Sequence, residues 1–229
     1  MAQQLVSRRD VDFNLYEMFH AEELCKLYRY KDLNKKVLDL IITEARSFAI
    51  KEILPTYVDG DTIGPRFEDG QVKMPESFKR AYQLSCENEW TAPSASQEHG
   101  GQGLPHIIAA AIREYMMAAN WPLYSFLSMG NGTARMIDLY GTEAQKKLYL
   151  ENLHTAKWGG TMLLTEPEAG SDVGALTTTA VKNEDGTYSI TGNKIFISSG
   201  EQDLTENIIH PVLARIEGAP AGSAGISLF

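Results

Sequence analysis

The sequence predicts an α+β protein in which an N-terminal all-α helical bundle is followed by an incomplete antiparallel β-barrel domain. Helical periodicity of the apolar residues dominates up to about Trp158, and short β-rich runs separated by turn residues follow it. The last apolar run is cut off at Phe229. We therefore expect residues 1–158 to form a bundle with an N-terminal extension, and residues 159–229 to form a truncated β domain.

The clearest helix is expected between residues 34 and 54, where apolar residues recur at steps of three and four. The predicted buried stripe consists of Val37, Leu40, Ile41, Ala45 and Phe48. Pro55 is expected to end this helix, because proline lacks the N–H group that a helix interior needs.

Four further helices are predicted in order. One begins after Pro75, because a missing N–H is harmless in the first turn. An alanine-rich segment at 104–120, apolar on most sides, predicts a central helix, which Trp121-Pro122 ends and after which the next helix starts. Thr142 and Gln145 have the spacing of a capping box, which predicts a helix start there.

Short β-branched and aromatic runs predict the strands of the second domain. They lie at 161–164, 176–181, 187–192, 194–198, 208–216 and 225–229. Asp185-Gly186 separates two of these runs and predicts a hairpin with a type I′ turn.

Composition narrows the classes of function. The chain has 229 residues, with 21 basic and 30 acidic side chains and a formal net charge of −9, so it would repel a polyanion and nucleic-acid binding is not expected. Two cysteines and the lack of a signal-like or membrane-length apolar run predict a cytoplasmic protein without a membrane span. A small ligand with phosphate groups is compatible with the negative net charge of the chain, because backbone N–H groups can hold phosphate without positively charged side chains.

Several common sites have no sequence support. No GxxxxGK[ST] loop and no GxGxxG turn is present, which argues against a P-loop and a Rossmann site. The five histidines form no HExxH pattern or Cys/His cluster, so no metal site is predicted. No GxSxG nucleophile motif is found.

The most informative segment is 161–174, with the sequence TMLLTEPEAGSDVG. An apolar strand leads into a loop in which Pro167 fixes one backbone angle, while Gly170 and Gly174 permit close approach. Thr165 and Ser171 add hydroxyl groups. Such a loop can present successive N–H donors to an anion, although a strand followed by a glycine-rich turn is often only a turn.

The segment resembles the flavin-binding signature of the acyl-CoA dehydrogenases, which runs apolar-Thr-Glu-Pro-x-Ala-Gly-Ser-Asp-Val. Three other segments are similar to motifs of that family in the same order: EHGGQGL at 98–104, GTEAQK at 141–146 and GNKIFISSG at 192–200. The long N-terminal lead is similar to the larger members, which carry extra helices before the common core. The resemblance implies a helical domain, a middle β domain and a C-terminal helical domain that this chain lacks.

By that resemblance the cofactor is FAD. Met162, Leu164 and Thr165 are expected against the isoalloxazine ring, with the Thr165 hydroxyl near flavin N5. Gly170 and Ser171 are expected at the flavin diphosphate and at the pantetheine arm of the substrate, so Ser171 is also a candidate substrate contact.

A second strand is expected to cover the other surface of the ring through Phe196, Ile197 and Ser198. The family more often has an aromatic residue at Met162, Trp and Thr at Phe196 and Ser198, and glycine at Glu168. Methionine and phenylalanine still pack on a ring and serine keeps the hydroxyl, so these differences are expected to alter the environment of a flavin site without removing it.

The implied reaction is the α,β-dehydrogenation of an acyl-CoA thioester to a 2-enoyl-CoA, as in fatty-acid β-oxidation, with electron-transfer flavoprotein as the acceptor. The catalytic base of the family is a glutamate of the C-terminal domain, and Glu166, Glu168 and Glu201 do not match it, so no catalytic residue is assigned to this chain. The helical segment from Tyr124 to Met129 is expected to line the acyl chain. The resemblance also implies a homodimer or homotetramer for the longer enzyme.

Two alternatives stay open at this point. An acyl-CoA oxidase or related flavin enzyme has the same scaffold and differs in how oxygen reaches the reduced flavin, which no motif reports. A non-catalytic binding module that reuses the bundle and part of the barrel is the alternative from a different class.

Overall fold

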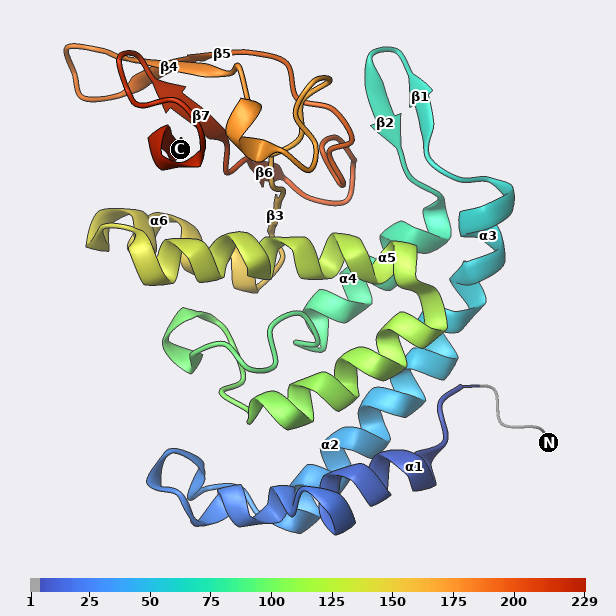
Figure 1. Cartoon of the computed structure of the whole chain (residues 1–229). Helices are drawn as coiled ribbons and strands as arrows, with labels where there is room; N and C mark the ends of the chain where they lie inside the picture. Colours follow the sequence, from blue (N-terminus) through green and yellow to red (C-terminus); the bar gives the residue numbers. More distant parts are fainter. Residues whose placement is uncertain (1–4) are drawn as a thin grey trace.

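The computed structural model describes residues 5–229 and has a helical part followed by a β part. Figure 1 shows the β part lying along one side of the last two helices, and the N-terminal extension lying at the opposite end of the molecule. The predicted order, a helical domain followed by a β domain, is therefore confirmed. No helix in residues 5–229 combines the length and the hydrophobicity needed to cross a bilayer.

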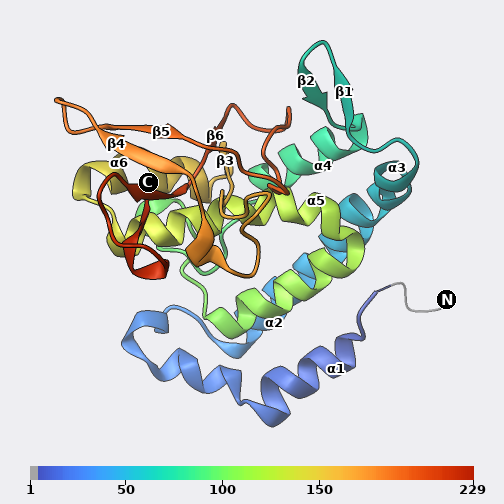
Figure 2. The ribbon, with the colours of Figure 1, turned by 45° about the horizontal axis from the view of Figure 1, so that its top comes forward.

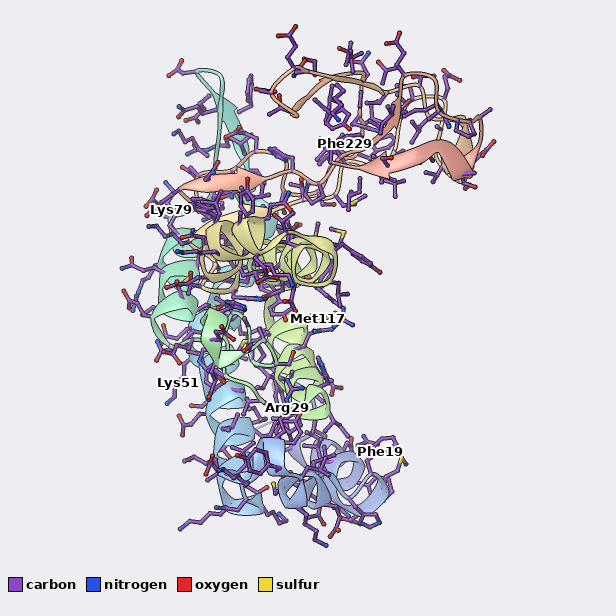
Figure 3. The ribbon with its side chains drawn as sticks, turned by 90° about the vertical axis from the view of Figure 1, so that its left-hand side faces the viewer. Phe19, Arg29, Lys51, Lys79, Met117 and Phe229 are labelled. Atoms are coloured by element: carbon purple, nitrogen blue, oxygen red, sulfur yellow. The ribbon has the colours of Figure 1, made fainter. Side chains whose placement is uncertain are left out.

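The N-terminal extension consists of short helical turns. These are α1 (Arg8–Asp12), η1 (Phe13–Met18), η2 (Ala21–Lys26) and η3 (Tyr28–Tyr30). Val11 and Leu15 face the core, whereas Phe19 lies on the outer side of the extension, as Figure 3 shows.

The first long helix does not end at Pro55 as predicted. α2 (Lys35–Phe48) continues through η4 (Ala49–Ile53), η5 (Leu54–Thr56) and α3 (Tyr57–Thr62). The proline is tolerated because it lies in the first turn of η5, where its missing N–H has no intrahelical partner to lose.

The predicted stripe is confirmed only in part. Ala45 is buried, and Ile41 and Phe48 pack partly buried against the core, whereas Leu40 is 59% exposed. The fully buried residues of this helical run are Leu38, Ile42, Ala45, Ala49 and Ile53, because the neighbouring elements cover that face. The remaining helices before the β part are α4 (Glu76–Glu87), α5 (His106–Tyr140) and α6 (Glu143–His154).

Helix α5 runs through the centre of the helical part, as predicted for the alanine-rich segment. It is kinked at Asn120, two residues before Pro122, where φ of −161° and ψ of 95° are not helical. The two helices predicted on either side of Trp121-Pro122 thus form one helical run with a kink. The core around α5 contains large apolar side chains that are fully buried. They include Leu38, Ile42, Ile53, Phe78, Ile108, Ile112, Tyr115, Met116 and Leu123.

The β part contains one four-stranded and one two-stranded sheet. The first has the order β5-β4-β7-β8 and is formed by β4 (Thr179–Lys182), β5 (Tyr188–Thr191), β7 (Leu213–Ile216) and β8 (Ile226–Leu228). β4 pairs antiparallel with β5 and parallel with β7. β3 (Trp158–Gly160) pairs in parallel with β6 (Asn207–Ile209). The expected antiparallel arrangement thus contains parallel pairs.

The hairpin at Asp185-Gly186 forms, but its turn is not type I′. Only Gly186 has a positive φ, of 86°, and the N–H of Gly186 donates to the carbonyl of Asn183 at 3.1 Å. The Asp185 carboxylate instead accepts from the backbone and the hydroxyl of Thr187, at 2.9 and 2.6 Å. These two bonds stabilise a loop that is longer than the two-residue type I′ turn and needs a positive φ only at Gly186. A further hairpin, β1 (Arg66–Glu68) with β2 (Gln71–Lys73), projects from the helical part, as Figure 2 shows.

The two parts are joined by close packing and by hydrogen bonds. A Cβ atom on Gly160 would lie 2.5 Å from the Thr133 hydroxyl and 2.9 Å from Cα of Gly130, so β3 approaches α5 more closely than any larger residue would allow. Asp203 accepts the N–H of Met74 at 2.8 Å and lies 3.1 Å from the ammonium group of Lys79. Figure 3 shows Lys79 at this junction.

Candidate functional site

The segment with the TEP sequence leaves β3 and runs beside the chain around Pro211. Thr161 donates its N–H to Ile209 at 3.0 Å, and Leu163 donates to Pro211 at 2.8 Å and accepts from Leu213 at 3.1 Å. Thr161 is buried and its hydroxyl is 2.8 Å from Nδ1 of His210. The segment is therefore fixed along one edge before it reaches the loop. We call residues 161–171 the first arm.

Glu166 occupies a tight turn in the first arm, and its carboxylate is almost completely buried. Its N–H and C=O groups both bond to Ala169, at 3.0 and 3.1 Å. One carboxylate oxygen accepts the N–H and hydroxyl of Thr177 at 2.6 and 2.8 Å, and the other accepts those of Thr178 at 3.1 and 2.5 Å.

Lys194 completes the environment of this carboxylate. Its ammonium group lies 2.8 Å from the Glu166 carboxylate and donates to the Leu164 carbonyl at 3.0 Å. The side chains of Glu166 and Lys194 are only 2% and 7% exposed. Burial by itself would raise the pKa of Glu166, but the bonds from Lys194, Thr178 and Thr177 outweigh it and hold that pKa well below its usual range. Glu166 is therefore a fixed anion.

The second flavin-motif segment, residues 192–200, lies directly beside the first arm, and we call it the second arm. The N–H of Ile195 donates to the Thr165 carbonyl at 3.0 Å. The predicted strand over 194–198 is wrong, since no strand forms there. Phe196 and Ser199 have φ of 58° and 59°, and these left-handed conformations interrupt extended pairing.

The side chains expected at a flavin ring differ in exposure. Phe196 is 88% exposed, while Met162, Leu164, Thr165 and Ile197 are partly buried. An apolar ring left in solvent next to a hydrogen-bonded pair of segments is a surface that a flat aromatic ligand can cover. The structure thus brings Thr165 and the Phe196 segment together.

The end of the first arm is open, and Arg215 holds the chain that follows it. Gly170 and Ser171 are exposed, and a Cβ atom on Gly170 would meet no atom within 4 Å. The guanidinium of Arg215 donates to the carbonyls of Gly174 and Gly222 at 3.0 and 2.9 Å and also bonds the Pro220 carbonyl. Ser171 has no recorded side-chain bond among the described residues, so its hydroxyl is available to a ligand.

One cavity lies between α5 and the second arm. Ser125 and Phe126 of α5 line a cavity of about 180 Å³ together with Ser198 and Ser199. Tyr124 and Ser128 instead line a larger hollow of about 670 Å³ beside the loop at 91–99. The helical segment expected to line an acyl chain therefore reaches the second arm on one of its faces.

Sequence reasoning missed the residues that hold these segments together. Glu166 and Lys194 were visible as members of the two motifs, but nothing in the pattern indicated that they pair across 28 residues. Thr177 and Thr178 lie in a run of three threonines that indicated only a strand. Arg215 carried no signal in the sequence.

The residues present fit a flavin. The exposed Phe196 ring, the partly buried Leu164 and Thr165 beside it, and the open loop at Gly170 and Ser171 offer an apolar surface followed by small polar groups. This succession suits a ligand with a flat aromatic end and a phosphate-bearing end.

Comparisons with known proteins identify the family of the chain. Residues 37–157 match the model of the acyl-CoA dehydrogenase N-terminal domain, and residues 161–229 match that of the acyl-CoA dehydrogenase middle domain. The chain belongs to the acyl-CoA dehydrogenase family.

Among curated relatives, the 3-methylmercaptopropionyl-CoA dehydrogenase of Ruegeria pomeroyi is 40% identical over 221 residues, which are 96% of this chain and 38% of that protein. The chain thus spans well under half of this relative.

Solved structures show the same fold. An acyl-CoA dehydrogenase of Bacillus anthracis, solved in complex with FAD, is 27% identical with a TM-score of 0.67, covering 87% of this chain and 31% of that chain. A structure described as the electron-transferring flavoprotein of Acidaminococcus fermentans is 28% identical with a TM-score of 0.67, covering 86% of this chain and 47% of that chain.

Proposed function

We propose that this chain supplies the N-terminal helical domain, residues 1–158, and part of the middle β domain, residues 159–229, of an FAD-dependent acyl-CoA dehydrogenase. The observation that carries the proposal is the hydrogen-bonded contact between the two flavin-motif arms, with Phe196 left 88% exposed beside them. The Bacillus anthracis relative, which binds FAD in its solved complex, supports the choice of cofactor.

The residues of the two arms have distinct roles in this proposal. Met162, Leu164 and Thr165 lie against the isoalloxazine ring, with the Thr165 hydroxyl near flavin N5, and Phe196, Ile197 and Ser198 cover its other surface. Gly170 and Ser171 lie at the diphosphate, and Ser171 also reaches the pantetheine arm of the acyl-CoA. FAD held by these residues would supply a hydride acceptor for the β carbon of the thioester, and loss of that hydride together with the α proton would give a 2-enoyl-CoA.

The chain's own groups orient the reactants, and the base comes from elsewhere. Glu166 cannot serve as base, because its carboxylate is buried, paired with Lys194 and saturated by Thr177 and Thr178. The glutamate that removes the α proton is proposed to lie in a C-terminal helical domain outside these 229 residues. The Tyr124–Met129 segment of α5 lines the acyl chain from the side of the second arm.

The experiment is anaerobic titration of the full-length gene product with short- and medium-chain acyl-CoA thioesters. The proposal expects visible flavin bands that bleach on addition of a suitable substrate, with enoyl-CoA as product. A colourless full-length protein would contradict the proposal and favour a binding module. Rapid reoxidation of the bleached flavin by oxygen would instead identify an oxidase.

The remaining features of the proposal concern the whole enzyme. Electron-transfer flavoprotein is the proposed acceptor of the electrons, and the similarity to the Acidaminococcus fermentans structure supports a link to that system. A homodimer or homotetramer, a role in β-oxidation and a cytoplasmic location stay predictions. For the 229-residue chain alone we expect weak or no FAD retention, because the rest of the site is proposed to come from the missing domain.

A further inference from the structure

Two segments that are separated in sequence must keep a fixed distance if they are to line one flat ligand. The direct backbone link between the arms is the bond from Ile195 to Thr165. Single backbone bonds near a loop open readily, because they compete with water. A second and stronger link is therefore needed to hold this arrangement.

The Glu166–Lys194 pair supplies that link. It joins the first arm to the second, and through Thr177 and Thr178 it also fixes the segment that leads into β4. The Lys194 ammonium bonds the Leu164 carbonyl as well, so the lysine contacts the first arm at two places. Gly192 lies against Thr178, since a Cβ atom there would be 2.1 Å from the threonine hydroxyl, and this leaves the second arm little freedom to slide.

The surroundings of the Glu166–Lys194 pair suit a structural role and do not suit a catalytic one. Both side chains are almost completely buried, and both carboxylate oxygens are occupied by several donors. Charge-assisted bonds of this kind are stronger and more directional than bonds between neutral groups. No other ion pair recorded among residues 5–229 has both partners below 10% exposure.

We propose that Glu166 and Lys194 are positioning residues that set the spacing of the two flavin-contacting arms through a buried ion pair fixed by Thr177 and Thr178. The proposal rests on the proposed function for the identity of the ligand that the arms hold. Its core, that the pair fixes the arms relative to each other, concerns the chain alone and can be tested without cofactor.

The first experiment measures amide hydrogen exchange in the full-length gene product, freed of cofactor. In Glu166→Gln and Lys194→Met, we expect exchange of the Ile195 and Ala169 amides to accelerate at least about tenfold, because one buried charge is left unpaired and the arms separate. Amides of α5 should keep their wild-type rates. The matched controls are Glu168→Gln, in the same turn but exposed, and Lys182→Met, exposed on β4; both should behave as wild type.

The double variant Glu166→Gln/Lys194→Met separates pairing from side-chain size. Because the double variant buries no isolated charge, the Ile195 amide should exchange more slowly in it than in Lys194→Met. Unchanged exchange in the arms would overturn the proposal. Equal acceleration in α5 and in the arms would also overturn it, since the pair would then stabilise the fold as a whole without positioning the arms.

The second experiment measures flavin binding by the same variants of the full-length gene product. We expect the dissociation constant for FAD to rise at least about tenfold in each single variant, with a blue-shifted or broadened flavin band, and to stay unchanged in Lys182→Met. Tight, spectrally normal FAD in variants whose arms exchange faster would overturn the positioning role. If the wild-type protein binds no FAD, the proposed function fails. The exchange data then decide by themselves whether the Glu166–Lys194 pair fixes the two arms relative to each other.

Discussion

The helical part and the β part of this molecule are held together by different kinds of interaction. Around α5, large apolar side chains are completely buried and form one continuous core. In the β part beyond residue 160, the buried apolar residues are few and mostly small: Ala169, Leu176, Ala180 and Ala214. Thr161, Glu166, Thr178 and Gln202 are buried with them, and hydrogen bonds specify their positions.

The difference shows what each part contributes. A large apolar core tolerates small changes of volume at moderate cost and gives the helical part a stable frame. A buried polar network has strict geometry, and it fixes loops that have too little apolar area to fix themselves. The segments proposed to contact a flavin are held in place by the buried polar network.

Breaking the polar network should have the largest effect on stability. Lys194→Met leaves the Glu166 carboxylate buried without its cation, which typically costs about 3 to 5 kcal/mol, and we expect this loss in the free energy of local opening of the arms. Amide exchange at Ile195, compared with that of the α5 amides, measures it, with Lys182→Met as the control that should lose almost nothing. A loss below about 1 kcal/mol would mean that the pair behaves like a surface ion pair.

Truncation in the apolar core should cost slightly less. Ile42 is fully buried between helices, so Ile42→Ala removes apolar contacts and leaves a cavity, at about 2 to 5 kcal/mol. Leu40→Ala, two residues away on the exposed side, should change the same denaturation midpoint little. A loss from Leu40→Ala as large as that from Ile42→Ala would contradict the burial of Ile42 and the exposure of Leu40.

Asn120 tests a polar contact inside the apolar part. Its amide donates to the Thr56 hydroxyl at 2.8 Å, and its carbonyl accepts the N–H of Leu123 at 3.1 Å, which stabilises the kink of α5. Asn120→Ala leaves buried groups without partners and should cost about 1 to 3 kcal/mol. Thermal unfolding provides the measurement, and no change in the midpoint would show that Pro122 alone maintains the kink.

Mild acid should weaken the helical part through His154. Burial, and secondarily the charge of His99, lower the pKa of His154 below 6.5, while Asp138 acts in the opposite direction. The folded state then binds fewer protons than the unfolded state, so stability present at neutral pH decreases as the pH falls below about 6.5, by at most about 1.4 kcal/mol per pH unit for one proton.

Thermal unfolding between pH 7.5 and 5 tests this dependence. His154→Gln should reduce the slope, because glutamine takes up no proton in this range. An unchanged slope in the variant would assign the effect to other groups.

The smallest effect is expected at the start of α6. The Thr142 hydroxyl accepts the N–H of Gln145, and the Gln145 side chain accepts the N–H of Thr142 at 2.8 Å. Thr142→Ala removes one of these bonds and should cost about 1 kcal/mol. Thr142→Ser keeps the hydroxyl and should lose much less, and equal losses in the two variants would show that the cap contributes little.

Local patterns in the sequence were sufficient for the order of the parts and for several boundaries. The capping box at Thr142, the helix after Pro75 and the hairpin at Gly186 are local features, because their bonds join residues a few positions apart. The site residues were reached through the two flavin motifs, and their assignment to cofactor and substrate stays a proposal.

Tertiary structure decided what local patterns leave open. The spacing in α2 allowed more than one buried face, and packing selected Leu38 and Ile42 over Leu40. The pairing of Glu166 with Lys194 and the left-handed Phe196 depend on segments brought together by the fold, and no periodicity encodes which distant side chains meet. The sequence by itself therefore determined the elements and their order, whereas only the tertiary structure decided which faces are buried and which charges hold the arms, because burial and pairing are properties of neighbours in space.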